Sequence, residues 1–311
     1  MAWTQNTHTS PTGAQLNYYV ILPPQKHRGK PRAILQINHG MAEQASRYQR
    51  FAEALANAGY GVYAHDHRGH GATTAPDAPL GTFAKTDGWN KVIADVHAMN
   101  TLIKSQNPNV PVIAFGHSMG AIITLGYSLT HPQSIAASAI WNSGVETGAL
   151  GFVLKSVLKI QRMFLGSDVP SALIKKLTFD TWNKEFAPNR TEFDWLSRDA
   201  AEVDKYVADP LCGFNCSIGL WIDLVEGVYF GADNNNLAKL PNALPVHLQA
   251  GAKDPCSNHG SAVANIAKRM EAAGLSDVTL NILADTRHES LNEINRDQST
   301  TDFIDWLNKR F

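Results

Sequence analysis

The sequence predicts an α/β protein in which helices cover both faces of a mostly parallel β-sheet. Short β-rich runs alternate with longer amphipathic segments along most of the 311 residues, which is the order that parallel strands with helical crossovers require. Residues 105–145 contain no Asp, Glu, Lys or Arg, and Pro111, Gly116 and Gly120 divide them into short pieces. Two buried strands with a buried helix between them explain this uncharged stretch better than one membrane-spanning helix does.

The strands are predicted from short apolar and β-branched runs, and the helices from apolar residues spaced three and four positions apart. Gly59 ends the first helix. The predicted order is strand 33–38, helix 43–58, strand 61–65, helix 87–105, strand 110–115, helix 121–129, strand 136–141, strand 246–250, helix 258–273, strand 278–283 and helix 291–309.

The alternation stops between residues 146 and 240, where several helices are predicted with no strand between them. An insertion that follows the carboxyl end of a strand in such a sheet lies over the crevice where ligands bind. We therefore expect a core made of residues 1–145 and 241–311, and a helical cap made of residues 146–240.

The composition excludes some classes of function. With 27 basic and 28 acidic residues the formal net charge is −1, so no overall charge attracts nucleic acid, and we expect no nucleic-acid partner. Three cysteines cannot all pair in a disulfide framework. The first residues lack the basic and apolar regions of a signal peptide. We expect a cytoplasmic protein, and the oligomeric state stays open.

The segment Gly116-His117-Ser118-Met119-Gly120 matches the pattern G-x-S-x-G. It follows an apolar strand and precedes an apolar helix, which is the setting of a nucleophilic serine at a sharp strand-to-helix turn. A glycine-rich turn with a capping serine is the alternative. The setting favours Ser118 as a catalytic nucleophile, with the backbone N–H of Met119 turned toward the substrate.

A serine nucleophile needs a base, which this arrangement supplies from a histidine late in the chain, after the acid. His288 follows the last predicted strand and precedes the last helix. His247 lies inside a strand and His259 opens a helix, so both fit less well. We expect His288 to be the general base.

The acid is expected after the penultimate strand. Asp254 lies there, and Pro255 turns the chain. Its carboxylate would fix the tautomer of His288 and stabilise the imidazolium that forms during catalysis. Asp285 and Glu289 are nearer to His288 in sequence and are less favoured alternatives.

A second oxyanion donor is expected from the loop that begins at His39-Gly40, through the backbone N–H of Met41, unless this is only a tight turn. Glu43 and Arg47 have the spacing of an ordinary helical ion pair. The histidine-rich loop 65–71 raises the alternative of a metal site, but no second group of ligands accompanies it. We expect a structural loop, with no metal ion and no cofactor.

These motifs together resemble the monoacylglycerol lipase and lysophospholipase group of α/β-hydrolases, which is also classified with serine aminopeptidases. The matching segments span nearly the whole chain: His39-Gly40-Met41-Ala42-Glu43 with Arg47-Tyr48, Asp66-His67-Arg68-Gly69-His70-Gly71, Gly116-His117-Ser118-Met119-Gly120, Asp254, and Arg287-His288-Glu289 with Leu291-Asn292-Glu293. The resemblance implies the α/β-hydrolase fold, with the cap inserted after the sixth strand. It also implies the triad Ser118, Asp254 and His288, and an oxyanion hole formed by the Met41 and Met119 amides.

The first predicted cap helix has an apolar face beside three cations. Its expected contact residues are Leu150, Val153, Leu154, Lys155, Val157, Lys159 and Arg162. This pattern is typical of a helix that touches a membrane surface reversibly, or of a lid that lines an acyl pocket. A cap helix packed on the core, with a solvated basic face, is the equal alternative.

The leading hypothesis is a serine carboxylester hydrolase that cleaves a small single-chain lipid ester, either a monoacylglycerol or a lysophospholipid. A second hypothesis is a short-chain esterase, thioesterase or aminopeptidase-like hydrolase. A third, from a different class, is a degenerate hydrolase that only binds a ligand. The complete triad and oxyanion loop disfavour the third hypothesis, whereas the head group and the acyl length stay open.

Overall fold

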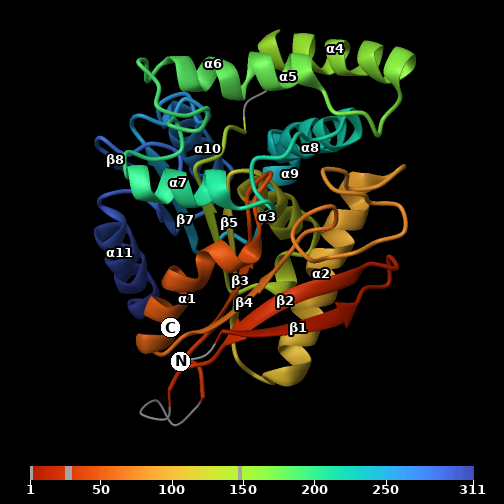
Figure 1. The fold of residues 1–311 in the computed structure, drawn as a ribbon. Coiled ribbons are helices and arrows are strands. Elements are labelled where there is room, and N and C mark those ends of the chain that lie inside the picture. The colour runs from red at the N-terminus through yellow and green to blue at the C-terminus, as the bar shows by residue number, and fades with distance from the viewer. Residues whose placement is uncertain (1–2, 25–29, 146–148) are drawn as a thin grey trace.

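The computed structural model describes residues 3–24, 30–145 and 149–311. Its centre is an eight-stranded sheet in the order β1-β2-β4-β3-β5-β6-β7-β8 (Figure 1). In this order, each strand from β4 through β3 to β8 pairs in parallel with the next. The predicted α/β-hydrolase fold is confirmed.

Two strands at the N-terminus are absent from the prediction. β1 (Thr4–Thr9) and β2 (Gln15–Ile21) pair with each other in antiparallel fashion, and β2 adds to β4. Most residues of β1 are exposed, so this edge strand lacks the apolar pattern by which strands are recognised.

The five central strands are buried along their whole length, which explains their apolar character. They are β3 (Ile34–Asn38), β4 (Gly61–His65), β5 (Val112–His117), β6 (Ala137–Trp141) and β7 (Val246–Gly251), and β8 (Val278–Leu283) is a partly exposed edge. In the ladders, Asn38 is opposite both His65 and Gly116. The loops that follow β3, β4 and β5 therefore begin side by side at one end of the sheet.

Helices cover both faces of the sheet. One hydrophobic cluster joins α1 (Gln49–Asn57), which follows the short 3₁₀ helix η2 (Ala45–Tyr48), and α11 (Arg296–Asn308) to the strands. Another cluster joins α2 (Gly88–Gln106), α3 (Met119–Thr130) and α10 (Ser261–Ala272) to the opposite face. The 3₁₀ helix η3 (Pro132–Ser134) leads from α3 to β6.

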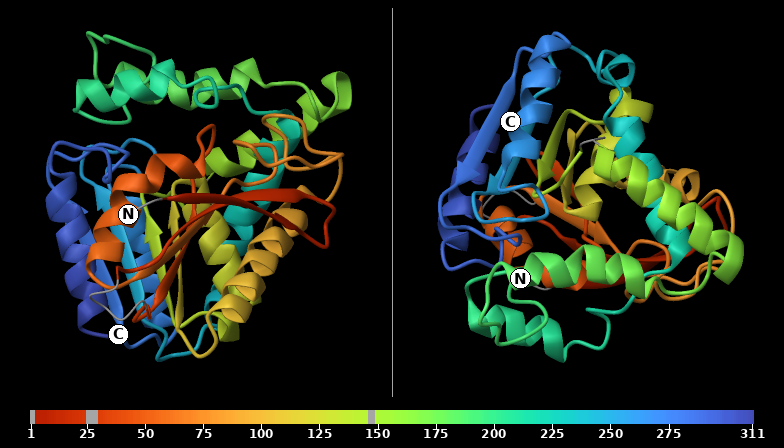
Figure 2. Two further views of the ribbon diagram at one scale, coloured as in Figure 1. Left: turned by 60° about the horizontal axis from the view of Figure 1, so that its bottom comes forward. Right: turned by 90° about the horizontal axis from the view of Figure 1, so that it is seen from above.

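The segment between β6 and β7 is helical, and no strand occurs in its described part. It contains α4 (Ala149–Leu165), α5 (Ala172–Leu177), α6 (Phe179–Lys184), α7 (Ala200–Ala208), α8 (Ile218–Gly231) and α9 (Asn234–Leu237). The helices α4, α5 and α6 lie in a row across the top of the molecule, as a layer apart from the sheet (Figures 1 and 2). In contrast, α8 packs against α2 and α3. The range 146–240 stays the predicted extent of the cap, and α8 within it also covers the core.

None of the helices in the described part of the chain is long and apolar enough to cross a bilayer.

Candidate active site

Ser118 lies at the turn between β5 and α3. Its backbone dihedral angles are φ 56° and ψ −121°, a strained conformation for a residue with a side chain. A Cβ on Gly116 would lie 2.1 Å from the carbonyl oxygen of Gly120, and a Cβ on Gly120 would lie 2.0 Å from that of Asn38. Both glycines are therefore required by close backbone contacts, and the turn presents Ser118 at the end of β5.

His288 and Asp254 come together although 34 residues separate them. The ring N–H at Nδ1 of His288 donates to Asp254 Oδ1 at 2.9 Å, and both side chains are buried. Burial alone would raise the pKa of Asp254, but the charge and hydrogen bond of His288 lower it by more than burial raises it, so that the pKa lies below its usual value. An ionised Asp254 thus orients His288, whose ring lines one pocket together with Ser118.

The alternative carboxylates do not take this place. Asp285 is exposed. Glu289 directs its carboxylate to Arg47, with Oε1 at 2.7 Å from Nη1 and Oε2 at 2.8 Å from Nη2. Of the three candidate acids, Asp254 is the one bonded to His288.

The expected oxyanion donors border the nucleophile. Met41 and Met119 line the same pocket as Ser118, and Met119 is the first residue of α3. Neighbouring groups hold the Met41 loop, because Gly40 N–H donates to Glu43 Oε1 at 2.5 Å. From the cap, the Tyr206 hydroxyl donates to the carbonyl oxygen of Ala42 at 2.9 Å.

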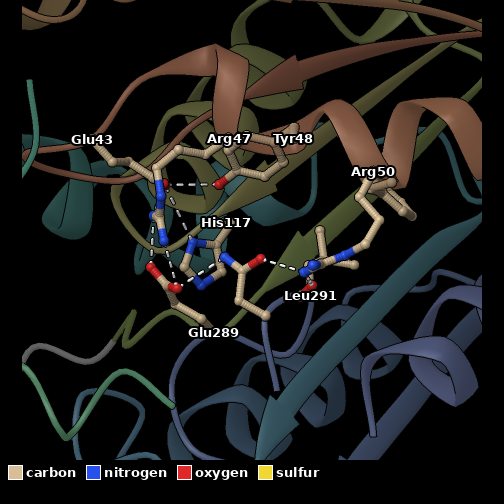
Figure 3. A pocket seen from close by; sticks show the side chains of 9 residues that line it. Glu43, Arg47, Tyr48, Arg50, His117, Glu289 and Leu291 are labelled. Carbon is tan, nitrogen blue, oxygen red and sulfur yellow. Dashed lines mark hydrogen bonds and ion pairs between the residues drawn. The ribbon is translucent and has the colours of Figure 1, made fainter. Parts of the chain in front are cut away.

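Figure 3 shows a buried ionic cluster that includes Glu43, Arg47, His117 and Glu289. It adjoins His288, because Nε2 of His117 lies 3.0 Å from the backbone carbonyl oxygen of His288. The guanidinium of Arg47 contacts Glu43 as well as Glu289, and the Tyr48 hydroxyl donates to Glu43 at 2.8 Å. Burial would raise the pKa of Glu43, but Arg47 lowers it well below its usual value. Burial would lower the pKa of His117, but Glu43 raises it. The ordinary ion pair expected from the sequence is thus part of a cluster that joins the loop after β3 to the loop after β8.

Two pockets of different character meet at Ser118. One has a volume of about 30 Å³, and its lining combines the polar side chains of Glu43, His117, Tyr206 and Glu289 with the rings of Phe179, Phe193 and Trp195. The other has a volume of about 180 Å³ and is mostly apolar. Its lining includes Met41, Met119, Ile122, Leu154, Phe179, Trp182, Trp221, Leu224, Val225, Val228 and Cys256.

The predicted contact residues of α4 point in different directions. Leu154 lines the apolar pocket, and Val157 packs against the core. The Lys155 ammonium lies 4.7 Å from the centre of the Tyr229 ring. Val153, Lys159 and Arg162 are exposed, and the side chain of Leu150 lies outside the described residues.

Sequence reasoning missed the aromatic side chains that the cap brings to the site. The Trp195 ring lies 4.7 Å from the His288 ring, measured between centroids, and Phe179 lines both pockets. The density of aromatic residues between positions 179 and 206 was a usable signal, although it does not indicate which rings face the triad.

The histidine-rich loop packs inward. Its rings lie against one another and against His39, with centroid distances of 4.5 Å from His39 to His67 and 4.7 Å from His65 to His67. Within the described ranges, the one group of three metal-ligating side chains with atoms inside 4.8 Å is Asp254, Cys256 and His288. Two of these, Asp254 and His288, are already hydrogen-bonded to each other.

Comparisons with known proteins agree with this geometry. The model of the serine aminopeptidase S33 family matches residues 29–295. Monoglyceride lipase of Mus musculus is 28% identical over 277 residues, which cover 87% of this chain and 80% of the relative. A monoglyceride lipase homolog of Monkeypox virus is 31% identical over 195 residues, which cover 63% of this chain and 62%, less than two thirds, of that relative.

Solved structures extend the likeness to the whole fold. A thermostable carboxyl esterase from Bacillus coagulans, solved in complex with glycerol, superposes with a TM-score of 0.89 at 25% identity, covering 99% of each chain. The family match covers most of the sequence and includes Ser118, Asp254 and His288. The chain therefore belongs to the serine aminopeptidase S33 family of α/β-hydrolases.

Proposed function

We propose that this enzyme is a serine carboxylester hydrolase that cleaves monoacylglycerols through an acyl-enzyme intermediate. The observation that carries the proposal is that a larger apolar pocket and a smaller pocket with polar side chains in its lining meet at Ser118. A monoacylglycerol has the same division, because its ester bond joins an apolar chain to a small polyol. Relatives named monoglyceride lipases support the assignment.

Each step of the reaction has a residue to perform it. Ser118 Oγ attacks the ester carbonyl while His288 accepts its proton, and Asp254 stabilises the resulting imidazolium. The Met41 and Met119 amides donate to the oxyanion. His288 then protonates the departing alkoxide, and a water molecule activated by His288 releases the fatty acid from Ser118.

The ionised side chains of the smaller pocket favour glycerol over a phosphate-bearing head group. Two carboxylates, Glu43 and Glu289, line this pocket, and Arg47 is already engaged by both. Hydroxyl groups can donate to carboxylate oxygens, whereas a phosphate would find no unpaired guanidinium or ammonium group among the residues that line this pocket. This argument favours monoacylglycerol over lysophospholipid.

The same pairing disfavours an aminopeptidase-like activity. An α-ammonium group needs a carboxylate whose charge is not already compensated. Arg47 compensates Glu43 and Glu289, and His117 also lies 3.7 Å from Glu43. A short-chain esterase would leave most of the apolar pocket unfilled.

The main experiment compares two substrates that share one acyl chain and differ in the head group. We expect a fluorophosphonate probe to label the wild-type protein and not Ser118→Ala. With one acyl chain, kcat/KM should be at least about tenfold higher for the monoacylglycerol than for the lysophosphatidylcholine, a difference of about 1.4 kcal/mol. It should also exceed the value for p-nitrophenyl acetate. A preference for lysophosphatidylcholine or for acetate would contradict the assignment.

We also propose that the enzyme contacts lipid surfaces reversibly through α4. The exposed fractions of Phe152, Met163 and Phe164 are 69%, 72% and 75%. Exposed Lys159 and Arg162 lie on the same helix. Apolar side chains flanked by cations are typical of helices that lie in a membrane interface, and such contact would give the acyl pocket access to a substrate held in a lipid layer.

A further inference from the structure

The residue before the oxyanion loop, His39, is wholly buried, and each of its ring nitrogens has a partner. Nδ1 lies 2.8 Å from the carbonyl oxygen of Gly40, and Nε2 lies 2.9 Å from the backbone nitrogen of His67. The mechanism described above uses neither contact. Both originate from loops that begin side by side, because Asn38 and His65 are opposite each other in the sheet.

The partners of His39 fix its tautomer. A backbone N–H can only donate, so Nε2 of His39 accepts from His67 and carries no proton. In the neutral ring the proton then resides on Nδ1, and this N–H donates to the Gly40 carbonyl. Burial lowers the pKa of His39, which keeps the ring in this neutral form.

The Gly40 carbonyl belongs to the same peptide unit as the Met41 N–H. In a trans peptide the C=O and N–H bonds point in opposite directions. Drawing the carbonyl toward His39 therefore turns the Met41 N–H the other way. Glu43 holds the preceding peptide unit through Gly40 N–H, and Tyr206 holds the Ala42–Glu43 peptide through the Ala42 carbonyl.

We propose that His39 is a positioning residue for the oxyanion hole: its Nδ1–H holds the Gly40–Met41 peptide so that the Met41 N–H faces the carbonyl attacked by Ser118. The proposal rests on the proposed ester hydrolysis. Without this donor, the Gly40 oxygen loses its partner in a buried site, and rotation of the peptide would direct a carbonyl oxygen at the developing anion. Loss of one oxyanion donor lowers kcat by about 10²–10³-fold.

Two variants separate positioning from packing. His39→Asn keeps an N–H near the position of Nδ1. His39→Gln places a carbonyl near the position of Nε2, where it can accept from His67, and leaves no donor at Nδ1. We expect kcat for a soluble p-nitrophenyl ester to fall about 10²–10³-fold in His39→Gln, with little change in KM. His39→Asn should retain kcat within about tenfold.

A trifluoromethyl ketone that forms a hemiketal oxyanion with Ser118 supplies a second readout. Its affinity should fall in parallel with kcat in His39→Gln, whereas the affinity for the corresponding alcohol, which has no oxyanion, should stay the same. Melting temperatures of both variants measure any loss of folding. Equal losses of kcat in the two variants, or a wild-type kcat in His39→Gln, would overturn the proposal. A wild-type protein without any esterase activity would instead contradict the proposed function.

Discussion

At the scale of single residues, the proposed chemistry depends on the carboxylate that contacts His288. Asp254 is buried, accepts from His288, and also accepts from the backbone N–H of Cys256 at 3.0 Å and the side chain of Asn142 at 3.3 Å. These donors stabilise the ionised form, which the lowered pKa of Asp254 reflects. Asp285 shares the loop of His288 but is exposed and has a positive φ of 55°.

The substitution Asp254→Asn should lower kcat by about 10⁴-fold, because the amide lets His288 adopt the wrong tautomer. The volume is conserved, so the melting temperature should change far less than the activity. Asp285→Asn is the matched control: asparagine tolerates a positive φ, and kcat should stay at the wild-type value. Turnover of a soluble p-nitrophenyl ester measures both variants. A severe loss in Asp285→Asn, or a mild one in Asp254→Asn, would show that the wrong acid has been chosen.

Candidate catalytic residues could be proposed from the sequence because their order along the chain, relative to the strands, is fixed in this fold. Residues that reach the site through contacts distant in sequence could not be proposed in this way. Ser118, Asp254 and His288 each follow a strand at the position that the fold demands. In contrast, the contact of Tyr206 with Ala42 spans 164 residues, and that of Arg47 with Glu289 spans 242. Nothing in the local pattern of either segment specifies its partner, since these contacts depend on how the cap and the last loop lie over the sheet.

At the scale of elements, burial decides which strands could be predicted. The five central strands are mostly apolar runs between turn signals, and their observed bounds differ from the predicted ones by only a few residues. The sequence of β1 is Thr-Gln-Asn-Thr-His-Thr, with five of its six residues exposed. Backbone hydrogen bonds to β2 stabilise β1 as a strand. Such bonds do not require apolar side chains, so the hydrophobic pattern of the sequence does not indicate this strand.

In the helix α4, the amphipathic pattern does not determine which apolar residues are covered and which are exposed. Its apolar residues lie on two sides: Leu154 and Leu158 face inward, whereas Phe152, Ile160, Met163 and Phe164 are exposed. Lys155 packs on Tyr229, so the cations do not share one solvated face. The periodicity predicted a helix with an apolar face, but the position of α8 decides which apolar residues are covered.

Removing the exposed side chains of α4 should weaken binding to lipid. In the variant Phe152→Ser/Met163→Ser/Phe164→Ser, co-sedimentation with anionic phospholipid vesicles should fall and the apparent KM for micellar monoacylglycerol should rise, because the buried apolar area is lost. Lys159→Gln/Arg162→Gln should weaken binding mainly at low salt, with about 1 kcal/mol for each cation. Turnover of a soluble short ester should not change.

The control for α4 replaces exposed apolar residues elsewhere. Leu80 and Ile294 are 53% and 63% exposed, and Leu80→Ser/Ile294→Ser should sediment with vesicles as the wild type does. Equal sedimentation of the α4 variants and the wild type would leave α4 as a cap helix without a membrane role.

At the scale of the whole molecule, the net charge is close to neutral at −1, and many ionisable side chains are buried. Burial lowers the pKa of His65, His70 and His247 to about 3. Neither ring nitrogen of His65 has a hydrogen-bond partner among the described residues. The folded protein therefore keeps these rings neutral at a pH where the unfolded chain, with a histidine pKa of about 6.5, binds protons.

The sign of the pH dependence follows from this difference. Between about pH 3 and 6.5 the unfolded state binds more protons than the folded state, so the free energy of unfolding falls as the pH falls, and the contribution is complete only above about pH 6.5. We predict that, when the pH falls from 7.5 to 5.5, the free energy of unfolding of His65→Leu decreases by about 1 kcal/mol less than that of the wild type. Urea unfolding at both pH values measures this difference. Ile37→Val, at a buried site without an ionisable group, should lower stability by about 1 kcal/mol at both. A wild-type pH dependence in His65→Leu would show that His65 is charged in the folded protein.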